Sequence, residues 1–107
     1  MSTTYDAIAD PTRRRLLGLL AECERTAGEL ASAFTISRPA VSRHLRVLRE
    51  AGLVRVRPRS RERVYLIDPR PLEEVDAWLA GLRAFWEPRL DALERYLDQQ
   101  RSETETP

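Results

Sequence analysis

Lysine is absent from this chain of 107 residues, and cysteine, histidine and methionine occur once each. A single cysteine, Cys23, excludes an internal disulfide. One thiol and one imidazole, that of His44, are also too few for a tetrahedral zinc site within one chain. No apolar run approaches the roughly 20 residues of a membrane-spanning helix, and the first residues lack the basic-then-apolar order of a signal peptide. These absences predict a cytoplasmic protein with no membrane partner, no metal and no other cofactor.

Arginine provides all 18 basic side chains, and they are distributed unevenly. Residues 1–64 hold 13 arginines against seven acidic residues, whereas residues 65–107 hold five arginines against ten acidic residues. The net charge of +1 therefore hides a basic part and an acidic part. The basic part favours a polyanion such as nucleic acid as partner. Arginine-rich solvated surfaces are also common, so charge alone leaves the partner open.

Sequence patterns of known catalytic sites are missing. The chain has no glycine-rich loop to hold a phosphate and no serine, histidine and aspartate in a catalytic order. The acidic residues Glu73, Glu74 and Asp76 are expected to solvate the outer face of a helix rather than to form a catalytic pair. An enzyme is therefore the least favoured class of function.

The first third of the chain predicts three short helices, over residues 5–9, 11–21 and 27–34. Asp10 followed by Pro11 is typical of a helix start, because the aspartate caps the first turn and proline lacks only an N–H that has no partner there. Thr26 and Glu29 match a capping box, in which the two side chains accept each other's backbone N–H. The arginines at 13–15 lie on a first turn, where a solvated face and a phosphate contact are both open.

The segment 37–53 predicts a DNA recognition helix over residues 37–51, with Ser37 as its cap. Val41, Leu45 and Leu48 recur at helical spacing and mark one buried stripe, while arginines and hydroxyls occupy the other faces. Guanidinium groups pair with phosphates and with the acceptor edge of guanine. Base edges are expected to be contacted by Arg38, Ser42 and Arg43, and phosphates by Ser37, Arg46 and Arg49.

Residues 53–57 and 63–67 predict two strands joined by a polar turn, because apolar residues and arginines alternate in them. Arginine stands at every second position through this hairpin, and we expect all of these side chains on one side. We interpret residues 55–63 as a wing that binds phosphates or enters a minor groove. The alternative is a charged edge that protects a strand from aggregation. The wing arginines are Arg55, Arg57, Arg59, Arg61 and Arg63.

A long amphipathic helix is predicted over residues 68–100, starting at Asp68-Pro69. Its apolar residues follow a nearly heptad pattern, typical of a helix that packs along another helix. A second copy of the chain is the expected partner, and a helix folded back on its own domain is the alternative. Pro88 predicts a kink or break near residues 85–87, and residues 101–107 are expected to be a disordered tail. The apolar seam comprises Leu72, Val75, Leu79, Leu82, Trp86, Leu90, Leu93 and Leu97.

Four segments in this order together resemble the ArsR/SmtB family of winged-helix transcriptional regulators. They are Ala9-Asp-Pro-Thr-Arg-Arg-Arg-Leu-Leu17, Ser37-Arg-Pro-Ala-Val-Ser-Arg-His-Leu45, Leu48-Arg-Glu-Ala-Gly-Leu-Val54 and Arg63-Val-Tyr-Leu66. The resemblance implies a homodimer built by the first and last helices, so that Tyr5 and Ile8 join the seam at the interface. It also implies binding to an imperfect palindrome in double-stranded DNA, and repression relieved by a small-molecule effector.

The chain departs from the metal-sensing members of that family. Those proteins hold metals through a Cys-x-Cys arrangement near the third helix, or through histidine and aspartate on the last helix. Here Cys23 stands alone, and the last predicted helix has neither histidine nor cysteine. His44 lies on the recognition helix, where a core-edge or DNA-backbone role is expected. The resemblance therefore points to a branch that does not sense metals.

The resulting prediction is a mainly α fold with a small β-hairpin, a winged helix-turn-helix in the order α-α-α-α-β-β-α. One domain is expected over residues 1–107, with a DNA-binding core at 5–67 and a C-terminal dimerisation helix at 68–100. The favoured function is a homodimeric repressor that binds a palindromic operator. The alternative is a winged-helix protein-interaction module that docks its basic face on an acidic partner.

Overall fold

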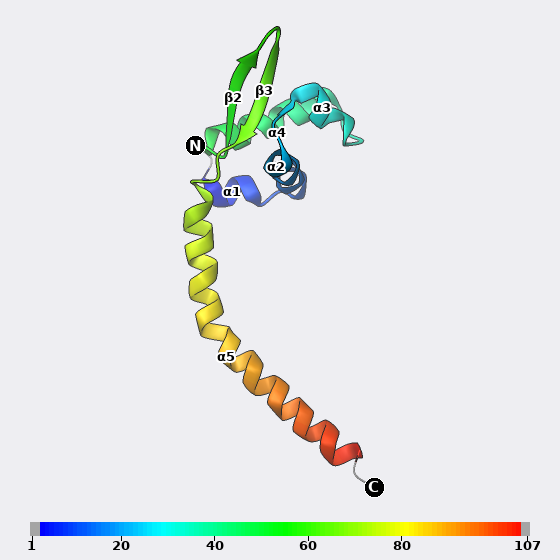
Figure 1. The fold of residues 1–107 in the computed structure, drawn as a ribbon, viewed down its shortest axis with the longest axis vertical. Helices are drawn as coiled ribbons and strands as arrows, with labels where there is room; N and C mark the ends of the chain where they lie inside the picture. The colour runs from blue at the N-terminus through cyan, green and yellow to red at the C-terminus, as the bar shows by residue number, and fades with distance from the viewer. Residues whose placement is uncertain (1–2, 106–107) are drawn as a thin grey trace. The chain divides into compact units, whose positions relative to one another are not determined.

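A computed structural model describes residues 3–105 as a mostly helical chain with one small antiparallel sheet (Figure 1). This confirms the predicted fold class. The chain divides into two units, Met1–Val75 and Asp76–Pro107. The elements are α1 (Thr4–Ile8), α2 (Pro11–Glu22), β1 (Arg25–Thr26), α3 (Ala27–Ser32), α4 (Arg38–Glu50), β2 (Val54–Arg59), β3 (Glu62–Ile67) and α5 (Leu72–Glu105).

Three predicted capping side chains begin helices of the first unit. The Asp10 carboxylate accepts the backbone N–H of Arg13 at 3.0 Å at the start of α2. Thr26 and Glu29 form the predicted capping box of α3, and Ser37 caps α4. Each cap satisfies a backbone N–H that has no partner inside its helix. The local start signals in the sequence were therefore confirmed where they cap α2, α3 and α4.

The core of the first unit lies where α2, α3 and α4 meet. The predicted stripe of Val41, Leu45 and Leu48 is buried, with at most 1% of each side chain exposed. It joins a cluster that includes Leu16 of α2 and Leu30 of α3. Burying an aliphatic side chain of this size stabilises the fold by roughly 1.5–3 kcal/mol. This contact fixes which side of α4 faces outward.

The sheet has three strands in the order β1-β3-β2, one more than predicted. β1 pairs with β3 through only two residues, Arg25 opposite Tyr65 and Thr26 opposite Val64. The sequence did not predict β1, because a strand of two residues is too short to show alternation. The pairing depends on a contact between segments almost 40 residues apart, which local sequence patterns do not reveal.

The register of the hairpin overturns the prediction that all wing arginines share one side. Residues directly opposite each other in an antiparallel pair lie on the same face of the sheet. Arg57 is opposite Val64 and Arg59 is opposite Glu62, whereas Arg63 is opposite Pro58 and lies on the other face. The two-residue turn causes this, because it makes residues 59 and 62 partners. Odd-numbered residues of β2 therefore share a face with even-numbered residues of β3.

The start of α5 differs from its prediction. Asp68 does not begin the helix, which starts at Leu72. Instead, Asp68 is 7% exposed, and its carboxylate binds the guanidinium groups of Arg55 and Arg70. The Asp-Pro pair resembled the start of α2, but the backbone N–H that the Asp68 carboxylate accepts is that of Arg70, at 3.2 Å and before the helix begins. Leu72 N–H then donates to the Pro69 carbonyl at 2.9 Å in the turn that opens α5.

In the second unit, α5 is one helix that continues through Pro88 to Glu105. Of the two predicted alternatives, a kink or a break, the break is therefore wrong, whereas Figure 1 shows the ribbon bending where its colour passes from yellow to orange. Proline removes one helical hydrogen bond, and the bonds on either side are sufficient to continue the helix. No helix among residues 3–105 is long and apolar enough to cross a membrane.

Residues 101–105 are helical, which corrects the prediction of a disordered tail from residue 101. Extending an existing helix needs no new nucleation, and arginine and glutamate are good helix formers. Polar composition alone therefore did not predict disorder correctly here. The rest of the predicted tail, residues 106–107, lies outside the described residues.

Gly52 ends α4 in a left-handed conformation, with φ of +78°. Its N–H donates to the Arg49 carbonyl at 2.9 Å, and the N–H of Leu53 donates to the Leu48 carbonyl at 3.0 Å. This pair of bonds is the Schellman arrangement, which turns the chain sharply after a helix. Gly52 thereby directs the chain from α4 into β2.

We expect Gly52→Ala to lower the free energy of unfolding by about 1 kcal/mol or more, because a β-carbon is unfavourable in the left-handed region. Gly18 is exposed within α2, and a β-carbon added there would enter open space, with no neighbouring side chain within 4 Å. Gly18→Ala should therefore stabilise the chain by about 0.5–1 kcal/mol through helix propensity. Urea denaturation measures both, and equal effects would contradict the assigned role of Gly52.

Candidate nucleic-acid interface

The outward side of α4 carries five polar side chains that are exposed and lie outside the buried stripe. Their placement follows from the helical period, since the core contacts occupy every third or fourth residue. Among residues 3–105, none of the four arginines in this set forms an ion pair. Their charge is therefore not neutralised within the described chain. The set is Arg38, Ser42, Arg43, Arg46 and Arg49.

Arg38 lies at the first position of α4, and its guanidinium group approaches the start of α3. A β-carbon at Gly28 would lie 3.6 Å from Nη2 of Arg38. Together with Arg61 and Arg63, Arg38 lines a pocket of about 470 Å³. The structure thus brings one predicted residue of the recognition helix together with two predicted residues of the wing.

Three of the five wing arginines are paired with carboxylates inside the chain. Nε of Arg55 lies 2.9 Å from Oδ2 of Asp68, and Nη2 of Arg59 lies 3.6 Å from Oε2 of Glu62. Arg57 on β2 binds Glu24 through both guanidinium and carboxylate forks. Arg61 and Arg63 form no ion pair within the described part of the chain. The wing is therefore divided into paired arginines on β2 and unpaired arginines after them.

The pair of Glu24 and Arg57 changes the titration of both groups. The hydrogen bond from Arg57 lowers the pKa of the Glu24 carboxyl, and the same contact raises the pKa of Arg57. A lowered carboxyl pKa means that the pair stabilises the fold above the ordinary glutamate pKa. This stabilisation is lost as the pH falls through the lowered value. The segment before β1 and the wing are thus held together at neutral pH.

Asp68 joins the end of the wing to the start of α5. Its carboxylate accepts hydrogen bonds from Nε of Arg55 at 2.9 Å and from Nη2 of Arg70 at 2.7 Å. Its backbone N–H donates to the Leu53 carbonyl at 2.7 Å. A nearly buried carboxylate needs such partners, because burying an unpaired charge is costly. Two arginines could have indicated this role in the sequence: Arg70 is two residues after Asp68, and Arg55 lies on the other strand of the predicted hairpin.

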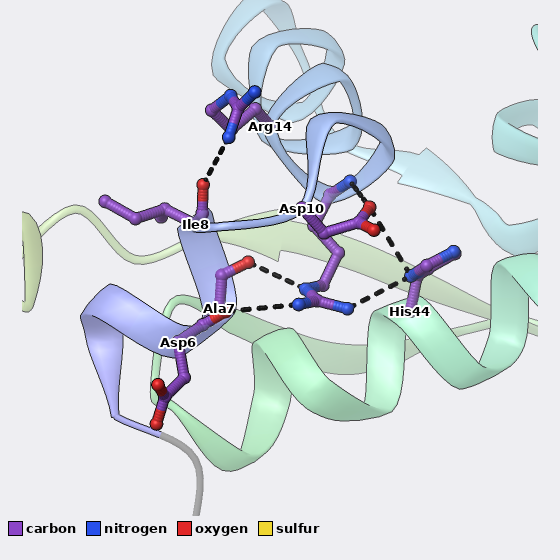
Figure 2. A network of polar contacts seen from close by, with 7 residues as sticks. Asp6, Ala7, Ile8, Asp10, Arg14 and His44 are labelled. Atoms are coloured by element: carbon purple, nitrogen blue, oxygen red, sulfur yellow. Dashed lines mark hydrogen bonds and ion pairs between the residues drawn. The ribbon is translucent and has the colours of Figure 1, made fainter.

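Arg13 and Arg14 bind the last carbonyls of α1, a role that the sequence did not reveal (Figure 2). Nε of Arg13 donates to the Ala7 carbonyl at 2.7 Å, and Nη2 donates to the Asp6 carbonyl at 3.1 Å. Nη1 of Arg14 donates to the Ile8 carbonyl at 2.8 Å. The final carbonyls of a helix have no partner inside it, so these guanidinium groups close α1.

The same network reaches the recognition helix through His44. Nη1 of Arg13 lies 3.4 Å from Nδ1 of His44, and Oδ2 of Asp10 lies 3.9 Å from that nitrogen (Figure 2). Because a guanidinium group only donates, Nδ1 accepts when this hydrogen bond forms. The pKa of Asp10 is lowered, chiefly by the hydrogen bond from the backbone N–H of Arg13. His44 therefore contacts the first turn of α2 and its N-cap.

The residues predicted for a dimer interface differ in their exposure. Tyr5 is 41% exposed, and its hydroxyl donates to the Glu74 carbonyl at 3.4 Å. Ile8 and Leu72 are partly buried and pack against the core of the first unit. Val75, Leu79 and Leu82 are half-buried, and the remaining seam residues are exposed. Those exposed residues are Trp86 at 38%, Leu90 and Leu93 at 51%, and Leu97 at 49%.

The residues of the chain that could ligate a metal are scattered. Within residues 3–105, no three or more histidine, cysteine, aspartate or glutamate side chains are grouped as a metal site would require. Cys23 is exposed at the end of α2. His44 has its Nδ1 directed at a guanidinium group.

Comparison with known proteins places this arrangement in a family. Residues 10–56 match the model of the bacterial regulatory proteins of the arsR family. The HTH-type transcriptional regulator Rv2034 of Mycobacterium tuberculosis is 40% identical over 100 residues, which cover 94% of this chain and 91% of the relative. The transcriptional repressor SdpR of Bacillus subtilis is 34% identical over 79 residues, covering 74% and 88% of the two chains.

Solved structures show the same likeness. A crystal structure of an ArsR family transcriptional regulator is 37% identical with a TM-score of 0.68, covering 78% of this chain and 91% of the other. The transcriptional repressor BigR of Xylella fastidiosa is 32% identical with a TM-score of 0.56, covering 66% and 74%. The chain belongs to the ArsR family of DNA-binding transcriptional regulators.

Proposed function

We propose that the protein is a homodimeric repressor that binds a palindromic operator through α4 and the wing. The observation that carries the proposal is the outward side of α4, where four arginines have no carboxylate partner within residues 3–105. Ser42 and Arg43 would contact base edges, and Ser37, Arg46 and Arg49 would bind phosphates. Two copies of α4 would lie about 34 Å apart, one turn of duplex.

The second copy is inferred from α5. Large apolar side chains along this helix remain exposed, including Trp78 at 53% and Phe85 at 61%. An exposed apolar surface of this extent is typical of an interface. The heptad-like seam suits a partner helix with the same pattern, and a second copy of α5 supplies one. Tyr5 and Ile8 of α1 are proposed to join that interface.

We also propose that the regulator responds to a small-molecule effector rather than to a metal ion, and that it acts in the cytoplasm without catalytic activity. The support is the chemistry of the side chains that could ligate a metal. Cys23 is the only thiol in the sequence, and Nδ1 of His44 faces Arg13 at 3.4 Å. Adding zinc or arsenite should leave operator affinity unchanged, whereas release of the operator by either ion would overturn this part of the proposal.

Selection of bound sites from random duplex DNA tests the main proposal. We expect an enriched imperfect palindrome, whose symmetry would reflect two copies of α4. The alternative, a module that docks its basic face on an acidic protein, predicts no enrichment and no retarded DNA at low salt. An enriched site without symmetry would contradict the dimeric arrangement.

Arg43→Ala should relax specificity at one base pair of each half-site, with a loss of roughly 1–3 kcal/mol of discrimination. The reason is that Arg43 has an exposed guanidinium on the outward side of α4 and no ion pair within the described residues. Arg61→Ala on the wing is the matched control, because it should weaken all sequences alike and flatten the salt dependence. Fluorescence anisotropy with a panel of singly substituted operators distinguishes these results. Unchanged base preference in Arg43→Ala would contradict its role.

Leu90→Glu should convert the dimer to a monomer, because it places a charge in the apolar seam of α5. Leu90 is 51% exposed in the single chain, so the substitution should leave the first unit folded. Ala77→Glu is the control, because it adds the same charge to an exposed position of α5 outside the seam. Analytical ultracentrifugation measures the mass of each variant. A dimeric Leu90→Glu variant would place the interface elsewhere.

Glu24→Gln should raise affinity for random duplex DNA by up to about fivefold at low salt, because it frees Arg57 for phosphates. Glu73→Gln, which removes an exposed acidic charge in the first turn of α5, is the control for net charge alone. Anisotropy titrations across a salt series compare the two variants. Equal gains in both would show that the contact between Glu24 and Arg57 does not compete with DNA.

A further inference from the structure

The pocket between α3, α4 and the wing arises because β1 is shorter than its partner. β1 pairs only with Val64 and Tyr65, whereas β3 begins two residues earlier, at Glu62. After Thr26 the chain turns into α3 instead of continuing along β3. The edge of β3 at Glu62 and Arg63 is therefore not covered by β1. A pocket of about 470 Å³ lies there, and Arg38 of α4 is among the residues that line it.

The charge of this pocket is strongly positive. Arg38, Arg61 and Arg63 all line it, and none of the three forms an ion pair within residues 3–105. One carboxylate, that of Glu62, also belongs to the lining. It is 3.6 Å from Arg59, and the register places it on the sheet face of Arg59, opposite to that of Arg63. Three guanidinium groups thus share the pocket with one carboxylate that already has a partner.

The chemistry of the lining favours a phosphate group. Guanidinium groups present planar donor pairs that match phosphate oxygens, and three such groups from two elements can surround one anion. Arg38 lies beside the start of α3, where a β-carbon added at Gly28 would be in ordinary van der Waals contact with its guanidinium group, 3.6 Å from Nη2. The three arginines come from the first turn of α4 and from the wing, the two elements proposed to lie along DNA.

We propose that this pocket holds one backbone phosphate of the bound DNA strand in each half-site. The proposal rests on the proposed function and names the group that the site takes. It also changes the role expected for Arg38, which binds a phosphate and not a base edge. Ser42 and Arg43, one turn further along α4, are left to contact the bases. The pocket then sets the register of α4 on the duplex, because a fixed phosphate determines which bases lie beside that turn.

The experiment uses the full chain and a duplex carrying the selected operator. Single methylphosphonate linkages, which are uncharged, are placed symmetrically at each position of the half-site. In the wild type, one position should lose roughly tenfold in affinity, as expected for removing a charge-assisted contact. In Arg63→Gln, the same position should show no further loss, since the contact is already missing. Arg101→Gln, on the last turns of α5, controls for the loss of one positive charge.

Further measurements separate the outcomes. Arg38→Gln should weaken binding to all operator variants alike and keep the base preference. An altered preference at one base pair would show that Arg38 contacts a base edge and would overturn the proposal. The proposal would also be overturned if the losses from Arg63→Gln and from the methylphosphonate were additive at every position.

NMR of the free protein with inorganic phosphate, at constant ionic strength, tests a free anion as the occupant of the pocket. Shifts at Gly28 and Arg63 without any methylphosphonate effect would assign the pocket to a free anion and refute the DNA phosphate. If the protein shows no sequence preference for any duplex, the proposed function itself is wrong, which is a different outcome from the failure of the phosphate pocket alone.

Discussion

The packing of the apolar stripe of α4 against α2 and α3 is the contact on which the other features depend. Val41, Leu45 and Leu48 are almost completely buried, and this fixes the rotation of α4 about its own axis. Since side chains follow the helical period, the rotation decides that arginines and a serine face outward. A helix turned by a third of a turn would bury charge and expose leucine. The basic surface is thus a consequence of the core.

Electrostatics then divides the arginines into two groups with different tasks. Those with carbonyl or carboxylate partners hold the architecture, as Arg13 does at the end of α1 and Arg57 does at the wing. The arginines of α4 and of the end of the wing, which form no ion pair within residues 3–105, keep their charge available. A uniform basic surface would bind any polyanion, whereas this division places the available charge along α4 and at one pocket. The positions of the acidic residues in the first unit therefore determine which arginines are neutralised and where the positive surface lies.

The sequence predicted most of what depends on neighbouring residues and missed what depends on distant ones. The caps at Asp10, Thr26 and Ser37 and the stripe of α4 follow from local hydrogen bonds and the helical period, and each was confirmed. The strand β1 and the reversal of Arg63 were missed, because both follow from pairing across the chain. A count of arginines at every second position ignored the turn between the strands. The fold class was therefore predictable, whereas the grouping of arginines around the pocket was not.

The network around Arg13 has a consequence for which residue types the chain accepts. Its Nε, Nη1 and Nη2 each face a different acceptor, the Ala7 carbonyl, His44 and the Asp6 carbonyl. A lysine ammonium carries its donors on one atom at the end of a flexible stem, so it cannot span three acceptors arranged around a planar fork. A substitution of Arg13 by lysine would thus keep the positive charge but lose these contacts. In a chain without lysine, Arg13 is a site where shape, and not only charge, demands the guanidinium group.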